Sequence, residues 1–157
     1  MELIFAQYQS IIVFLHVISA VVWVGGMIAI RFSAHYALAQ LEGPQRLART
    51  AHMLNNLFKI VVPFVLLLLL TALIMALAMD LHQSELKVLT FAKEGIWSVM
   101  ALNLGMMILR RNKAQRFIDA GDFANAKSML GPIGTLMVPI NITLGVVAIF
   151  LGVLLRF

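Results

Sequence analysis

The chain has 157 residues, of which 62% are hydrophobic and 12% charged, with a formal net charge of +5 and no cysteine. Soluble globular proteins carry roughly 25% charged residues, so this composition excludes a soluble enzyme and a nucleic-acid-binding module and indicates an integral membrane protein. Without cysteine, disulfides, thiolate metal sites and cysteine catalysis are excluded. The length accommodates about four spans of ~20 residues.

The first predicted span covers about residues 10–30, because no charged residue lies between Glu2 and Arg31. We expect this span to be retained, since the N-terminus lacks the basic region of a signal peptide. The helix should continue beyond the membrane as far as Gly43 and Pro44. Glycine would end it there, and proline would open the next helix.

The second predicted helix begins outside the membrane. Its apolar residues Leu47, Ala51, Leu54 and Phe58 recur at helical spacing, which predicts an amphipathic segment lying against a partner protein or the lipid headgroups. The second span follows over about residues 60–79.

The third predicted span covers about residues 88–109 and contains Lys93 and Glu94 in its outer part. After it, we expect a helix end at Ala120 and Gly121 and an N-cap at Asp122, opening a short helix over 123–130.

Gly131 and Pro132 should end that short helix. The fourth predicted span covers about residues 133–155. Pro139 should bend it, and Asn141 should hydrogen-bond a neighbouring helix.

Lysine and arginine set the orientation. The connection over 31–59 holds four of them and the connection over 110–127 holds five, so both connections should be cytoplasmic and both termini periplasmic. The predicted fold is a single all-α domain over 1–157, a four-transmembrane-helix up-down bundle with cytoplasmic helix extensions.

Two spans carry ionisable residues at a similar depth. At 1.5 Å per residue, His16 lies ~22 Å from Arg31, and Lys93 lies ~25 Å from Arg110. Glu94 falls in the same layer, toward the outer face. Such residues are expensive to bury in lipid and suggest a functional site, although His16 could serve helix packing and Lys93 could pair with Glu94 or reach the interface.

Aromatic residues share the faces of these ionisable residues. Trp23 follows His16 by seven positions, and Trp97 and Met100 follow Lys93 by four and seven, so each set lies on one helix face. Two such faces could enclose a cofactor.

The pattern formed by His16, Trp23, Gly26, Arg31 and His35 resembles the first span of the HemJ-type protoporphyrinogen oxidases and of the broader CopD-like copper-resistance membrane proteins. The resemblance implies a b-type haem, with His16 and Lys93 at the characteristic positions, and the bacterial inner membrane as the location.

The first hypothesis is therefore a haem b-binding membrane redox protein, either similar to a protoporphyrinogen oxidase or passing electrons to quinone; whether it is an enzyme stays open. Lys93, Met100 or His82 could supply the second axial ligand. The candidate residues fall into three groups: Lys93 and Arg31 for catalysis, with Arg31 meeting an anionic group; His16, Trp23, Gly26, Trp97 and Met100 for the cofactor; His16 and His82 as metal ligands.

Two alternatives remain. A copper-handling protein would use His16 and the methionines as ligands for Cu(I). A non-catalytic accessory subunit of a membrane complex would dock a partner through segments 44–58 and 122–130. The expected partners are membrane lipid, quinone or porphyrin, and a second copy of the chain or a larger complex.

Overall fold

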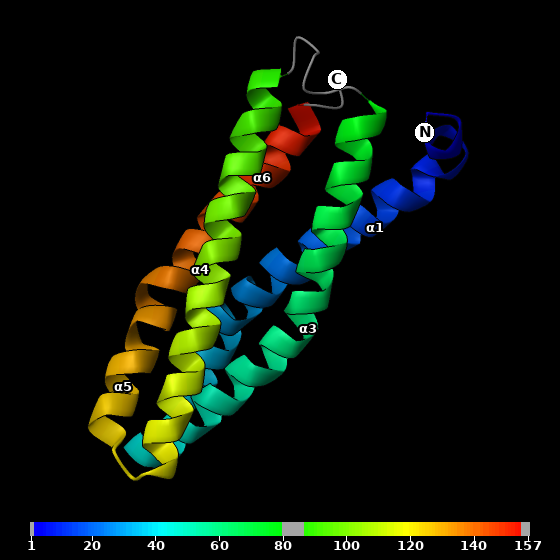
Figure 1. Cartoon of the computed structure of the whole chain (residues 1–157). Coiled ribbons are helices and arrows are strands. Elements are labelled where there is room, and N and C mark those ends of the chain that lie inside the picture. The colour runs from blue at the N-terminus through cyan, green and yellow to red at the C-terminus, as the bar shows by residue number, and fades with distance from the viewer. Residues whose placement is uncertain (1, 80–86, 155–157) are drawn as a thin grey trace.

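The computed structural model describes residues 2–79 and 87–154, and the regular structure in that part of the chain is helical. The elements are α1 (Glu2–Ala29), the π-helical segment η1 (Ile30–Ala34), α2 (His35–Ala39), α3 (Gly43–Ala78), α4 (Lys87–Asp119), α5 (Phe123–Pro132), the π-helical segment η2 (Ile133–Met137) and α6 (Val138–Leu154). They form four long antiparallel helical runs (Figure 1), which confirms the predicted all-α four-helix arrangement.

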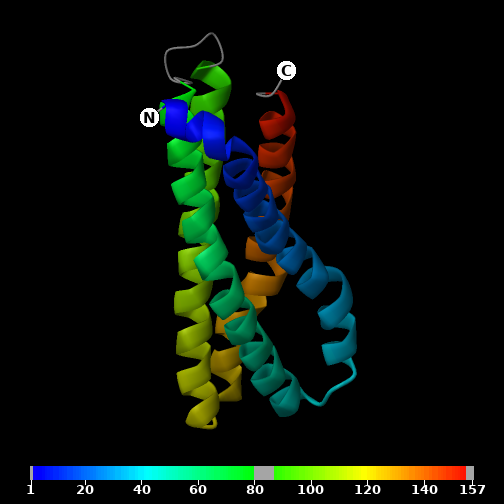
Figure 2. The same cartoon turned by 90° about the vertical axis from the view of Figure 1, so that its right-hand side faces the viewer.

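Three of these runs are long and apolar enough to cross a membrane: Gln7–Ala39, Gly43–Ala78 and Phe123–Leu154. They indicate a multi-pass membrane protein. The start of α1 and the end of α6 lie at the same end of the molecule (Figure 2), opposite the turns that follow α2 and α4. The fourth run, α4, lies against α3, α5 and α6.

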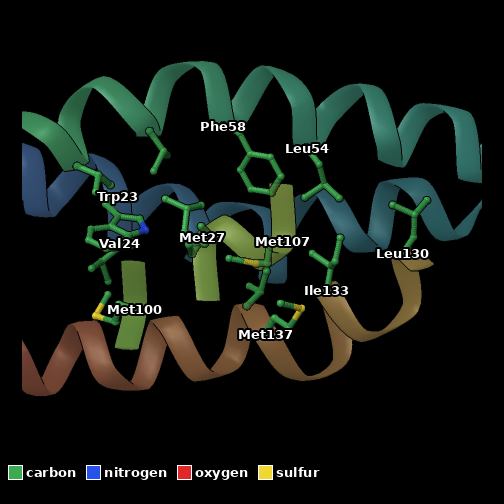
Figure 3. Close-up of a cluster of buried hydrophobic side chains, with 14 of the residues drawn as sticks. Trp23, Val24, Met27, Leu54, Phe58, Met100, Met107, Leu130, Ile133 and Met137 are labelled. Carbon is green, nitrogen blue, oxygen red and sulfur yellow. The ribbon is translucent and has the colours of Figure 1, made fainter. Parts of the chain in front are cut away.

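The core forms along seams of regularly spaced residues. On α3 the buried residues alternate in steps of three and four: Ala51, Leu54, Phe58, Val61, Val65 and Leu68. This spacing keeps one stripe of a helix facing its neighbours. The α3 stripe meets Trp23 and Met27 of α1 and Met107 of α4 in a single buried cluster (Figure 3).

Two glycines let the helices approach closely. A Cβ at Gly26 would lie 2.9 Å from Cδ1 of Leu57 on α3, and a Cβ at Gly145 would lie 2.5 Å from Cγ2 of Val24 on α1. Both separations are shorter than ordinary van der Waals contact. Gly26 and Gly145 therefore set the distances of α1 from α3 and from α6.

A pair of buried amides joins α4 to α6. Asn103 donates from Nδ2 to Oδ1 of Asn141 and to the carbonyl oxygen of Met137, both at 2.8 Å, and Asn141 donates to the carbonyl oxygen of Met100 at 3.4 Å. The predicted interhelical hydrogen bond of Asn141 is confirmed. The Met137 carbonyl belongs to η2, so Asn103 also braces the irregular turn.

The short helix α5 ends at Pro132, as predicted, but the break predicted at Gly131 and Pro132 is wrong. The chain continues through Pro132 into η2 and α6, and Figure 1 shows the run changing direction between α5 and α6. Proline lacks an N–H and crowds the carbonyl four residues earlier. Pro139 disturbs the carbonyl of Thr135 inside η2, so a π-helical turn replaces a break.

The predicted helix stop at Gly43 is also wrong. The α2 helix ends at Ala39, and Gly43 is instead the first residue of α3, with Glu42 as its N-cap. Pro44 lies in the first turn as predicted, where its missing N–H has no helical partner to lose.

The apolar face of the amphipathic segment over 44–58 packs within the chain. Ala51, Leu54 and Phe58 are buried in the same cluster as Leu130 and Ile133 of the α5–η2 run (Figure 3). The apolar faces of both segments proposed for docking thus cover one another, because each helix must bury its apolar stripe against a neighbouring element.

The turn between α4 and α5 matches its prediction. Gly121 adopts a positive φ of 75°, a conformation that glycine tolerates without strain. The Asp122 carboxylate then accepts hydrogen bonds from the backbone and side-chain nitrogens of Asn125. These bonds favour the charged carboxylate and lower the pKa of Asp122 below its ordinary value.

Removing one amide of the Asn103 and Asn141 pair should leave the other buried without its partner. We expect Asn103→Leu and Asn141→Leu each to destabilise the protein by about 1 to 3 kcal/mol. The double variant should lose less stability than the sum of the two single variants, because the hydrogen bond between the two amides is broken only once. Unfolding by denaturant in detergent measures all three; strictly additive losses would show that the two side chains do not interact.

Candidate functional site

His16 is half-buried on the face of α1 that packs against α3. Its Nδ1 lies 3.0 Å from Oγ1 of Thr71. The Thr71 hydroxyl lies 2.8 Å from the carbonyl oxygen of Leu67 and donates its one hydrogen to the backbone, so the same oxygen accepts from Nδ1–H. This assignment leaves the neutral imidazole with its lone pair on Nε2.

Lys93 lies at the same end of the bundle. It is half-buried, and its Nζ is 3.0 Å from the position that a Cβ on Gly152 of α6 would occupy. Its ammonium also lies near enough to His16 to interact electrostatically. We call His16, Thr71 and Lys93 the outer polar layer; it brings together side chains from α1, α3 and α4, with Gly152 of α6 making room.

Two tryptophans lie on the inner side of this layer. On α6, Gly145 approaches Met100 of α4, and Gly152 approaches Lys93 of α4. The two contacts are seven residues apart on each helix, so Trp97 of α4 falls between them. Trp23 precedes Val24, which also meets Gly145.

The indole nitrogens of Trp23 and Trp97 are buried and have no hydrogen-bond partner within the described residues. An unsatisfied buried donor costs about 1 to 3 kcal/mol, and such groups in a native structure often mark a missing water or ligand. The two indoles thus add donors close to the outer polar layer.

The other predicted site residues occupy different places. Met100 is buried between α1 and α6, where its Cε lies 3.3 Å from the position that a Cβ on Gly145 would occupy. Gly26 contacts α3, as described above. Arg31 lies toward the opposite end, where its Nη1 donates to the carbonyl oxygen of Gly134 at 3.4 Å. His82 lies outside the described residues.

Arg31 therefore joins the two π-helical segments, because it belongs to η1 and Gly134 belongs to η2. Segments of this kind leave carbonyl groups without their regular helical partners. The structure places Arg31 as a brace between these segments, apart from His16 and Lys93.

Sequence reasoning missed Thr71 and Gly152. Threonine within a span commonly bonds its own helix backbone, and nothing in the sequence says that its oxygen also faces His16. Gly152 lies in an apolar helix, and no neighbouring residue in the sequence indicates a contact with Lys93. The spacing of seven residues between Gly145 and Gly152 is the one available hint of close contacts at two levels.

The outer polar layer has a defined chemical capacity. It offers an imidazole lone pair and an ammonium group in a largely apolar surrounding, and the two tryptophans on its inner side add indole N–H donors. Such a set suits a metal-centred or carbonyl- and carboxylate-bearing ligand. Comparison of the chain with family models, with curated proteins and with solved structures found no match.

Replacing Thr71 by valine should remove the acceptor that holds Nδ1–H of His16. We expect the Nδ1-protonated tautomer to lose its dominance in Thr71→Val and to persist in Thr71→Ser, because serine keeps the oxygen. Nitrogen NMR of protein labelled at histidine reports the tautomer directly. The same tautomer signal in Thr71→Val and the parent protein would refute the assigned hydrogen bond.

Proposed function

We propose that all four helical runs cross the membrane, including α4. The α4 helix runs beside α3 and α6, which are apolar enough to span (Figure 1). Its outward residues Val99, Leu102, Met106 and Leu109 are each more than half exposed. A contiguous apolar stripe of this kind is unfavourable in water and suits contact with lipid.

The proposed orientation is the one that the cations favour, in the inner membrane of a bacterium. The end of the bundle that holds Arg110 and Arg111 faces the cytoplasm, and the outer polar layer lies toward the periplasm with both termini. Arg111 donates from Nε to the carbonyl oxygen of Ala51 at 2.9 Å. Partial burial lowers the pKa of Arg111 below its ordinary value, yet a guanidinium stays charged in proteins.

Single cysteines at the two ends of α4 test whether this helix crosses. The chain contains no cysteine, so Lys87→Cys and Lys113→Cys report without background. A membrane-impermeant maleimide added to intact cells should label Lys87→Cys, and should label Lys113→Cys only after the membrane is opened. Labelling of both positions from the same side would show that α4 does not cross.

We propose further that the chain is a haem b-binding membrane redox protein, with His16 as an axial ligand. The observation that carries this proposal is the 3.0 Å separation of His16 Nδ1 and Thr71 Oγ1, which we assign to a hydrogen bond donated by the imidazole. A ligating histidine usually donates its other nitrogen to a protein acceptor, which fixes the ring and leaves one nitrogen for the metal. Thr71 supplies that acceptor within an apolar bundle.

The space open to a flat cofactor lies toward the outer end of α1 and not at the close helix contacts. Below the outer polar layer the helices are in close contact at Gly26 and Gly145. The α1 residues Gln9, Ser10, Val13, Phe14 and Val17 line an open hollow of about 540 Å³ on the outward side of that helix, and His16 is not among its lining residues. The donor groups at this end, from Lys93 and Trp97, suit the carboxylates that a haem carries.

The residues of the layer and the two tryptophans on its inner side have separate tasks in this proposal. Thr71 orients His16, Lys93 provides a cation for an anionic group or a proton for a reacting atom, and Trp23 and Trp97 exclude water and offer hydrogen bonds. Haem b, when bound, supplies one-electron redox chemistry, and its potential depends on the ligands and on the dryness of the site. Quinone or a porphyrinogen is the proposed electron partner, as the resemblance to HemJ-type proteins implies.

A copper site is the second candidate. Four methionines from three elements, α1, α4 and η2, are buried in the core, namely Met27, Met100, Met107 and Met137 (Figure 3). Thioethers are soft ligands that suit Cu(I). They also pack well as ordinary apolar side chains, so this candidate rests on the composition of the core.

His16→Ala should abolish haem binding. We expect the purified variant to lose the Soret band of the parent protein, because no other described histidine lies in the outer polar layer. His52→Ala is the matched control: His52 is exposed on α3 at the opposite end of the bundle, and its removal should leave the haem content unchanged. Full haem content in His16→Ala would exclude His16 as the ligand, and copper without porphyrin in the parent protein would favour the second candidate.

A further inference from the structure

A second hollow lies at the end of the bundle opposite the outer polar layer. It has a volume of about 540 Å³ and is lined by Leu41, Gln45, Ala48, Arg49, His52 and Gln115. These residues come from the turn before α3, from the first three turns of α3 and from the last part of α4. The lining contains one arginine and one histidine and no acidic residue among the described residues.

His52 lines this hollow and has one ring nitrogen engaged by a neighbouring side chain. Its Nε2 lies 3.1 Å from Nδ2 of Asn56, one turn further along α3. An amide NH₂ can only donate, so Nε2 is the acceptor and the proton of the neutral ring lies on Nδ1. Nδ1–H is therefore left to bind another group, and Asn56 serves as the positioning residue.

The nearby acidic groups are engaged elsewhere or lie outside the lining. Asp119 accepts a hydrogen bond from Nε2 of Gln115 at 2.9 Å, and Gln115 accepts from Nη2 of Arg111 at 3.3 Å. Glu42 is the N-cap of α3 and does not line the hollow. The Arg49 guanidinium thus has no carboxylate among the lining residues.

The position of the hollow adds to its positive character. It begins at the N-terminal turns of α3, a helix of 36 residues whose first N–H groups carry partial positive charge. Arg111 holds the adjacent turn of α4 against α3 through the carbonyl oxygen of Ala51. A planar guanidinium and an imidazole N–H near a helix N-terminus recognise tetrahedral oxyanions well.

We infer that this hollow binds the phosphate group of an anionic ligand through Arg49 and His52. The phosphate comes either from a phospholipid headgroup, since the hollow lies just beyond the apolar part of α3, or from a soluble phosphorylated molecule. Phosphate binding here does not depend on haem at the opposite end of the bundle.

The test uses the full chain purified in detergent and freed of lipid. Two probes are titrated at constant ionic strength, inorganic phosphate and phosphatidylglycerol in mixed micelles, with chloride and phosphatidylcholine as their controls. Binding to the folded state raises the thermal unfolding midpoint. We expect at least one probe to raise it in a saturable way.

Arg49→Gln should weaken the binding of that probe about tenfold, because a charged hydrogen bond is lost. Arg46→Gln is the matched control, because it removes the same charge from the same helix. Arg46 is exposed and does not line the hollow. Arg46→Gln should weaken binding less than about twofold.

The outcomes distinguish the two sources of the phosphate group from the absence of a site. Saturation by inorganic phosphate identifies a soluble phosphorylated ligand, and saturation by phosphatidylglycerol alone identifies a headgroup; both support the site. The proposal is overturned if neither probe shifts the midpoint, or if Arg49→Gln and Arg46→Gln weaken binding equally.

Discussion

Buried polar groups in a membrane bundle must find their hydrogen-bond partners inside the protein, because the surrounding lipid offers none. This constraint organises the contacts between helices. Asn103 and Asn141 join α4 to α6, and His16 binds Thr71 of α3. Apolar seams bring the helices together, but apolar side chains could pack in several registers. These few polar contacts favour one register, because only that register pairs the polar groups.

Two buried polar groups that lack hydrogen-bond partners among the described residues lie toward one end of the core. The indole nitrogens of Trp23 and Trp97 are buried without partners in the described part of the chain, and both lie just inside the outer polar layer. A sequence selected only for packing would place phenylalanine there, since it fills similar space without an unpaired donor. Unpaired donors on the inner side of a layer that holds a hydrogen-bonded imidazole are compatible with a ligand site, and they add to the haem proposal.

The sequence predicted the elements well because hydrophobicity and cap chemistry are local. The Asp122 cap and the four helical runs follow from short stretches of residues. The course of the chain at Pro132 was missed, because the π-helical turn that Pro139 favours at η2 is also held by a contact with another helix, the hydrogen bond from Asn103 to the Met137 carbonyl. Thr71 and Gly152 were missed for the same reason: their importance arises only when α3 and α6 meet His16 and Lys93.

The haem content of the purified chain tests the central proposal most directly. A reduced-minus-oxidised spectrum and pyridine extraction give the type of haem and the amount per chain. We predict a b-type spectrum with haem near one per chain or per pair of chains. A well-folded protein that shows no haem band after expression with ample haem supply would contradict the proposal. The outer polar layer would then serve only to hold the helices together.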